Sequence, residues 1–149
     1  MEKIITNTYQ ETQDIGKNLA EGILMSKAQK GALVLCLQGD LGAGKTTFLQ
    51  GFAKGLGIND MVNSPTFVIM KKFPIKNRNF KYFYHFDCYR LNSPEEMLEL
   101  GFKNIISDPK NIVAIEWPEK ISKLLPQNNI SITFEHLEEN KREISIKMQ

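Results

Sequence analysis

Apolar residues in the first third of the chain follow two different spacings. Residues 11–27 and 45–56 carry them at the intervals of a helix that buries one face. Residues 32–37 are apolar without interruption, which is typical of a strand covered on both faces in a parallel sheet. Gly57 follows the second helical stretch and is a natural helix terminator. With a short strand at residues 3–6, the pattern predicts strand, helix, strand, helix.

The rest of the chain contains five apolar runs with the length of strands: residues 68–70, 82–89, 112–115, 130–134 and 143–147. Residues 71–81 are rich in Lys and Arg, and we interpret them as a basic connector, more readily a solvated loop than a nucleic-acid site. Ser93 is predicted as a helix N-cap, with Pro94 at the first helical position and Glu96 closing a capping box. The polar residues 136–142 are predicted to join the last two strands as a hairpin.

Strands that alternate with helices predict an α/β fold with a mostly parallel central sheet flanked by helices. The C-terminal hairpin adds antiparallel strands at an edge of this sheet. The length of 149 residues is near the usual size of one domain, so a single domain over residues 1–149 is expected.

The composition argues against several classes of protein. A net charge of only +2 is unlike that of a chain whose main task is to coat DNA or RNA. No apolar run approaches the length of a membrane span, and the first residues are too polar for a signal peptide. Cys36 and Cys88 do not form a C-x-x-C pair, so reduced thiols are expected. We therefore predict a cytoplasmic protein without membrane or DNA contacts.

The most specific feature of the sequence is Gly-Asp-Leu-Gly-Ala-Gly-Lys-Thr at residues 39–46, which matches the phosphate-loop pattern G-x-x-x-x-G-K-[ST]. It lies between a predicted strand and a predicted helix, as the mechanism requires. Glycines let backbone N–H groups point at phosphate oxygens, and the helix N-terminus adds positive charge. Lys45 is placed to contact the β- and γ-phosphates, and the Thr46 hydroxyl can ligate Mg²⁺. The alternative is a glycine-rich turn that binds no ligand. It is disfavoured because all four fixed positions of the pattern are matched between a predicted strand and a predicted helix.

Two acidic residues complete the predicted nucleotide site. Glu116 ends an apolar strand, where phosphate-loop proteins carry the acid that holds Mg²⁺; the alternative is a surface Glu at a strand end. Asp87 lies in an apolar, aromatic strand, where an unpaired charge is costly. It can orient the attacking water or hold Mg²⁺ through water. Alternatively, it is a structural residue that pairs with Arg90 or caps a turn.

Two further positions are interpreted less specifically. His85 shares a strand face with Asp87, but a single His beside aromatic residues is more often packed in a core than catalytic. Ser64-Pro65-Thr66 lies where many phosphate-loop hydrolases have a switch loop, so that the Thr66 hydroxyl can approach the γ-phosphate or Mg²⁺. An ordinary proline turn that enters a strand explains the same residues equally well.

Four blocks of sequence together resemble the TsaE (YjeE) family of small bacterial ATPases: residues 39–47, 63–67, 84–91 and 115–119. The resemblance implies a P-loop NTPase-like fold in which ATP is bound with Mg²⁺ and slowly hydrolysed to ADP. It also implies two partners, a TsaD-like transferase and a TsaB-like subunit. With these partners, proteins of the family are needed for N6-threonylcarbamoylation of adenosine 37 in tRNAs reading ANN codons, although they do not transfer the group themselves. Engagement of tRNA is expected to be indirect, and direct contact with this chain stays open.

The same resemblance assigns roles to individual residues. Lys45, Asp87 and Glu116 match positions that act in catalysis, and Thr46 and Glu116 match the Mg²⁺ ligands. The positions that match nucleotide-binding residues are Tyr9, Gly42, Ala43, Gly44, Lys45, Thr46, Thr47, Trp117 and Arg142. Within this set Tyr9 falls where the N-terminal segment covers the base, and Arg142 matches a position against the nucleotide.

Three other functions fit part of the pattern. A small-molecule kinase usually needs an Arg-rich lid, and the chain has only Arg78, Arg90 and Arg142. A GTPase needs a D-x-x-G motif and an N-K-x-D motif that recognises guanine. Residues 140–143 match the second motif only weakly. A nucleotide-gated binding module, in which ATP sets the shape of a docking surface without required hydrolysis, also stays open. The sequence favours a weak Mg²⁺-dependent ATPase that its partners stimulate.

Overall fold

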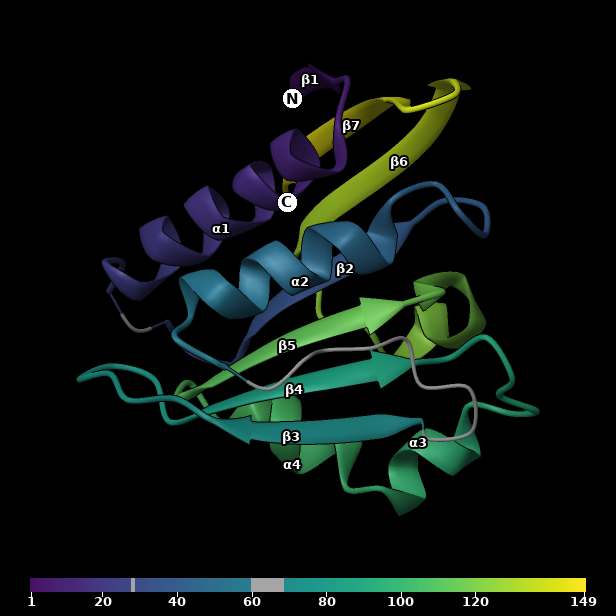
Figure 1. The fold of residues 1–149 in the computed structure, drawn as a ribbon. Helices are drawn as coiled ribbons and strands as arrows, with labels where there is room; N and C mark the ends of the chain where they lie inside the picture. Colours follow the sequence, from purple (N-terminus) through teal and green to yellow (C-terminus); the bar gives the residue numbers. More distant parts are fainter. Residues whose placement is uncertain (28, 60–68) are drawn as a thin grey trace.

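The computed structural model describes residues 1–27, 29–59 and 69–149. Its strands form a seven-stranded sheet in the order β1-β7-β6-β2-β5-β4-β3 (Figure 1). Their bounds are β1 (Glu2–Thr6), β2 (Leu33–Gln38), β3 (Met70–Pro74), β4 (Tyr82–Asp87), β5 (Asn111–Glu116), β6 (Ile130–Glu138) and β7 (Lys141–Met148). β6, β2, β5 and β4 pair in parallel, whereas β1, β7 and β3 pair antiparallel toward the two edges. The predicted α/β fold with a mostly parallel core and a C-terminal hairpin is confirmed.

Helices cover both faces of this sheet (Figure 1). One face carries α1 (Tyr9–Leu24) and α2 (Lys45–Gly55); the other carries α3 (Glu95–Glu99), α4 (Phe102–Ser107) and the 3-10 helix η1 (Pro118–Leu124). Strand β2 contributes Leu35 and Leu37 to the core beneath α1 and α2, and Val34 and Cys36 to the core on the opposite face. Both sets are buried, which explains the uninterrupted apolar run in the sequence.

The two helices on the first face pack unusually closely. A Cβ atom at Gly51 of α2 would lie 1.9 Å from the carbonyl oxygen of Gln13 in α1, and one at Gly16 would lie 2.2 Å from the Phe48 carbonyl. A Cβ at Gly55 would be equally obstructed, at 2.5 Å from the Lys17 carbonyl. These glycines therefore let the two backbones touch, and they fix the start of α1 relative to the start of α2.

Two helix starts differ from the prediction. α1 begins at Tyr9 rather than residue 11 because the Thr8 hydroxyl accepts a hydrogen bond from the Glu11 N–H and caps the helix. It also ends at Leu24, before residue 27. The expected capping box at Ser93 is wrong. α3 is a single turn starting at Glu95 without a side-chain cap, and the Glu96 carboxylate accepts from the Asn92 N–H instead.

Two predicted connectors are strand in part. Residues 70–74 form β3, so the basic segment expected at 71–81 connects strands only after Pro74. The hairpin is longer than expected, because β6 continues to Glu138 and β7 begins at Lys141.

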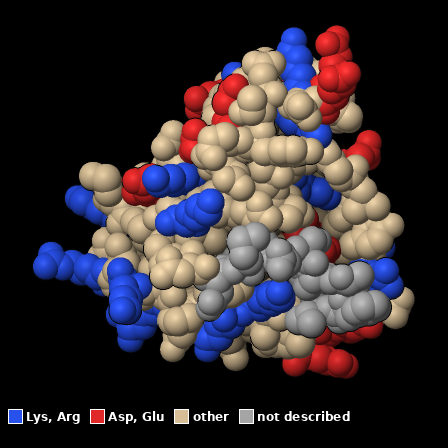
Figure 2. All heavy atoms as spheres, viewed as in Figure 1, with Lys and Arg blue, Asp and Glu red and all other residues tan. Residues whose placement is uncertain are grey.

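Lys and Arg side chains gather where the β3–β4 connection and the C-terminal ends of α1 and α2 lie (Figure 2). Among the described helices, none combines the length and apolar character needed to cross a membrane.

Candidate functional site

The segment with the phosphate-loop sequence connects the carboxyl end of β2 to the start of α2 (Figure 1). Gly39, Gly42 and Gly44 have φ values of 151°, 80° and 110°, a region that residues with a Cβ atom rarely adopt. Gly44 stands at the N-cap of α2, where no side chain bonds to the first N–H groups. The loop therefore leaves the positive end of α2 available to an anion.

A cavity of about 720 Å³ surrounds this loop, within the range usual for small-molecule sites. Its walls come from the loop, the starts of α1 and α2, the carboxyl ends of β4 and β5, and the β6–β7 hairpin. The lining residues are Thr8, Tyr9, Thr12, Leu41, Gly42, Gly44, Lys45, Thr46, Thr47, Ile69, Asp87, Tyr89, Arg90, Glu96, Glu116, Trp117, Asn140 and Arg142. Binding crevices of α/β sheets lie at such a carboxyl edge.

Lys45 is buried at the floor of the loop. Its Nζ donates to the carbonyl oxygen of Gly39 at 2.7 Å and lies 3.9 Å from the centroid of the Trp117 ring. Burial lowers the pKa of Lys45, while the carboxylates of Glu116 and Asp87 oppose this shift. The ammonium group is thus held by a carbonyl and an aromatic face, two neutral partners that a phosphate would readily replace.

Trp117 is held over the loop by a strained backbone. Its φ of 58° is in the left-handed region, at the N-cap of η1 and directly before Pro118. Such a conformation costs a bulky residue about 1–3 kcal/mol, and this kind of strain is concentrated at functional sites. The indole packs on Tyr89 with ring centroids 5.1 Å apart. The turn therefore directs an aromatic pair at the part of the cavity next to the phosphate-loop residue Lys45.

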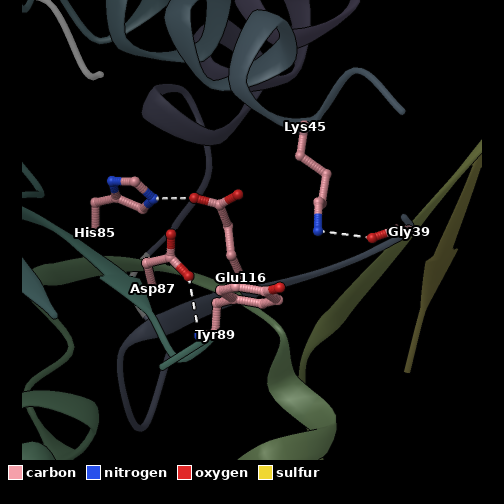
Figure 3. A network of polar contacts seen from close by, with 6 residues as sticks. All are labelled: Gly39, Lys45, His85, Asp87, Tyr89 and Glu116. Carbon is pink, nitrogen blue, oxygen red and sulfur yellow. Dashed lines mark hydrogen bonds and ion pairs between the residues drawn. The ribbon is translucent and has the colours of Figure 1, made fainter. Parts of the chain in front are cut away.

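The two acidic residues end adjacent parallel strands. The register of β4 and β5 pairs Asp87 with Glu116, so both carboxylates lie at the edge from which the loop emerges. The Oε2 atom of Glu116 lies 2.7 Å from Nε2 of His85, and both side chains are buried (Figure 3). The structure thus brings Asp87, Glu116 and Lys45 together at one cavity, and His85 lies buried behind Glu116.

The structural interpretation of Asp87 as a residue that caps a turn is confirmed, and its position in the cavity wall agrees with the functional interpretation. Its Oδ1 accepts from the N–H of Tyr89 at 3.0 Å, which caps the turn after β4 (Figure 3). The residue also lines the cavity. Burial raises the pKa of Asp87 and the Glu116 carboxylate adds to the rise, whereas the Tyr89 N–H opposes it. A carboxylate with a raised pKa is the better proton acceptor, which suits a group that orients water.

Arg142 connects the β6–β7 hairpin to the phosphate loop. Its guanidinium donates to the carbonyl oxygen of Glu139 at 2.7 Å and to that of Gly42 at 3.3 Å. Its side chain lies 3.8 Å from the position of a Cβ at Gly44, so it passes directly beside the start of α2. Tyr9 is 63% exposed and stands with Thr8 at the N-terminus of α1, where its ring is accessible to a ligand.

The donors around the loop suit Mg²⁺. Thr46 and Glu116 offer a hydroxyl and a carboxylate, the hard oxygen ligands that this cation takes together with water and phosphate oxygens. The described residues contain no group of three His, Cys, Asp or Glu that would hold a metal alone. Two protein oxygens beside an anion site therefore fit a cation that arrives with a phosphate ligand.

Most of the predicted site residues lie in the cavity wall. Ala43 does not: it is buried below the loop, and its N–H donates to the carbonyl of Asp40. The predicted switch loop around Thr66 lies outside the described residues. The structure buries His85, in agreement with its interpretation as a packed residue, and in addition places its ring against Glu116. The available signal was its position two residues before Asp87, on the same strand face.

Fold and site together define the class: an α/β protein with a parallel core sheet and a cavity built on a phosphate-loop sequence. The family model "Threonylcarbamoyl adenosine biosynthesis protein TsaE" matches residues 6–144. The chain belongs to the TsaE family.

Individual relatives agree with this assignment. Relatives named "tRNA threonylcarbamoyladenosine biosynthesis protein TsaE" include one from Rickettsia felis, 41% identical over 96% of this chain and 78% of the relative. One from Bacillus subtilis is 42% identical over 75% of this chain and 67% of the relative. The crystal structure of B. subtilis YdiB is similar, with a TM-score of 0.69, 32% identity, and coverage of 97% of this chain and 83% of that chain.

Proposed function

We propose that this chain is a weak Mg²⁺-dependent ATPase that serves N6-threonylcarbamoylation of adenosine 37 in tRNAs reading ANN codons. The observation that carries the proposal is the convergence of Lys45, Asp87 and Glu116 on one cavity around a phosphate loop. The family assignment supplies the pathway. The cofactor is Mg²⁺, and ATP and ADP are the nucleotide ligands.

The reaction is phosphoryl transfer to water, in which positioning and charge stabilisation do most of the work. Lys45 exchanges the Gly39 carbonyl for phosphate oxygens, and the N–H groups at the start of α2 stabilise negative charge. Thr46 and Glu116 hold Mg²⁺, which neutralises charge on the phosphates when bound. Asp87 orients the attacking water, since its carboxylate faces the cavity and has a raised pKa.

The remaining residues place the nucleotide. Tyr9 covers the base at the N-terminus of α1, while Trp117 and Arg142 close the cavity on two sides. Arg142 already donates to carbonyls of the hairpin and of the loop, so it is a positioning group rather than a free arginine finger. We therefore infer low turnover by the isolated chain and stimulation when a partner completes the site.

The partners we propose are a TsaD-like transferase and a TsaB-like subunit in the cytoplasm, with tRNA engaged through them. The chain does not transfer the threonylcarbamoyl group itself. The chain acts by changing its conformation, because nucleotide binding must release Lys45 from both Gly39 and Trp117. The same release also favours the second candidate function, a module that nucleotide binding alone switches.

The test is nucleotide binding and turnover by the purified chain, with and without the two transferase subunits. We expect ADP to bind in a Mg²⁺-dependent manner and ATP turnover to rise when both subunits are added. Lys45→Ala should abolish turnover, while Lys54→Ala, a change near the end of the same helix and outside the cavity, should leave it unchanged. Absence of nucleotide binding, or fast turnover that the subunits do not alter, would overturn the proposal.

A further inference from the structure

His85 is buried next to the cavity without lining it. It stands on β4, 1% exposed, and its Nε2 lies 2.7 Å from the Oε2 atom of Glu116. The β4–β5 register pairs His85 with Ala114, so Glu116 is its diagonal neighbour on the face that carries α2. Among the described residues, the hydrogen bond to the Glu116 carboxylate links His85 to the site.

The hydrogen-bond inventory of the ring indicates which nitrogen carries the proton. The Nδ1 atom of His85 is buried and has no hydrogen-bond partner among the described residues. A protonated Nδ1 would be a buried N–H donor without an acceptor, which is costly in free energy. An unprotonated Nδ1 is a buried acceptor without a donor, which costs less. A proton on Nε2 therefore fits the surroundings, and it makes His85 the donor to a carboxylate oxygen.

The hydrogen bond between His85 and Glu116 sets the orientation of the Glu116 carboxylate. Oε2 is held on the His85 side, and the second oxygen is turned away from the ring (Figure 3). Without the imidazole, Glu116 would still be attracted by the Lys45 ammonium and repelled by the Asp87 carboxylate. An ion pair with Lys45 would occupy both groups that the phosphates and Mg²⁺ require.

We propose that His85 is a positioning residue that holds the Glu116 carboxylate in the orientation that receives Mg²⁺. The inference rests on the proposed function, because it concerns the Mg²⁺ ligand of the nucleotide site. His85 touches neither nucleotide nor metal. It fixes one carboxylate oxygen so that the other faces the cavity, as hydrogen-bonded groups behind metal ligands commonly do.

Substitutions at two buried positions of the same strand face test this role. His85→Leu removes the donor, and His85→Gln retains an N–H donor at similar reach. Phe83→Leu is the control, since Phe83 is fully buried on the same face and outside the cavity. For His85→Leu we expect about 10- to 100-fold more Mg²⁺ for half-maximal ADP binding, measured by calorimetry. ADP binding in EDTA should be unchanged.

The control comparisons separate positioning from a general loss of structure. His85→Gln should recover most of the Mg²⁺ affinity, and Phe83→Leu should lower thermal stability without changing the Mg²⁺ requirement. In a Glu116→Gln background, His85→Leu should have no further effect, because the two residues act as one unit. For turnover, the loss should appear in the Mg²⁺ requirement rather than in the KM for ATP at saturating Mg²⁺.

Nuclear magnetic resonance of the unmodified chain tests the contact without a variant at position 85. The sequence has only two histidines, so His136→Gln assigns the imidazole signals. We expect a slowly exchanging Nε2–H resonance from His85, far downfield as for a charge-assisted bond, that moves upfield in Glu116→Gln. The absence of this resonance overturns the proposal even if His85→Leu does not fold.

The outcomes distinguish the two levels of inference. If the unmodified chain binds no ADP at any Mg²⁺ concentration, the proposed function fails and the role of His85 fails with it. If ADP binds with Mg²⁺ and His85→Leu has an unchanged Mg²⁺ requirement, the proposed function stands and the positioning role is wrong.

Discussion

The close contact between α1 and α2 makes Gly51→Ala a demanding test of the structure. The new Cβ would lie 1.9 Å from the Gln13 carbonyl oxygen, whereas ordinary contacts begin near 3.4 Å. The helices must therefore separate by about 1.5 Å at this point. Sliding along one another gives no relief, because Gly16 and Gly55 are also in backbone contact with the opposite helix.

The magnitude follows from two opposing terms. Overpacking a tight interface costs about 1–3 kcal/mol, and contact with a backbone oxygen on a rigid helix places this site near the upper value. Replacing Gly by Ala inside a helix returns about 1 kcal/mol. The net expectation is a loss of about 2 kcal/mol, which lowers Tm by roughly 4–8 °C in a chain of this size.

Gly22→Ala is the matched control. Gly22 lies in α1 and is exposed, and a Cβ added there would have no other atom within 4 Å. It should gain about 0.5–1 kcal/mol from helix propensity alone, and Tm should rise by roughly 1–4 °C. Both values can be measured by thermal and urea denaturation.

The same pair of variants tests the link to the site. Thr8, Tyr9 and Thr12 carry the cavity wall on α1, while the phosphate loop leads into α2. Because the helices separate in Gly51→Ala, this variant should bind ADP more weakly. Gly22→Ala should bind ADP as tightly as the unmodified chain. If Gly51→Ala is as stable as Gly22→Ala, the close backbone contact between the two helices is wrong.

Three further predictions concern other parts of the molecule. Trp117, the single tryptophan, should change its fluorescence when ADP and Mg²⁺ bind, because Lys45 must leave its ring; the change should be absent in Lys45→Ala. Arg142→Gln should weaken ADP binding more than Lys141→Gln, since the Arg142 side chain donates to the carbonyl of Gly42 in the phosphate loop; calorimetry would contradict this if both variants bind equally. Burial raises the pKa of Cys36 to about 11 and that of Cys88 to about 12, so neither thiol should react with a thiol reagent until the chain is unfolded. The unfolded thiols ionise near 9.0, so the free energy of unfolding should fall as the pH rises from there toward 12, and less steeply when both cysteines are replaced by alanine.

The features that could be predicted from sequence depend on residues close together in the chain. The phosphate loop, its flanking strand and helix, and Glu116 at a strand end are local patterns. The pairing of His85 with Glu116 is not local, because it depends on the parallel register of β4 and β5 across 31 positions. A His in an aromatic strand has the same sequence pattern whether or not a carboxylate lies opposite.

Most of strand β3 was not predicted, because its Lys residues suggested a connector, and there is a physical reason for their presence in a strand. The ammonium group of Lys72 lies 4.0 Å from the centroid of the Tyr82 ring, so a long cationic side chain covers an aromatic surface of β4. Charge therefore indicated a connector where the chain forms an edge strand. The start of α1 was missed similarly, because Thr8 caps the helix three residues before the helical stretch predicted from residue 11.

We propose that ATP turnover at this site supports modification of tRNA by other subunits. The most direct measurement is a reconstituted reaction containing this chain, the two transferase subunits and tRNA, in which ATP hydrolysis and multiple-turnover modification are followed together. We predict that Glu116→Ala still docks on the subunits but loses both activities. Normal modification with Glu116→Ala and with Lys45→Ala would contradict the account.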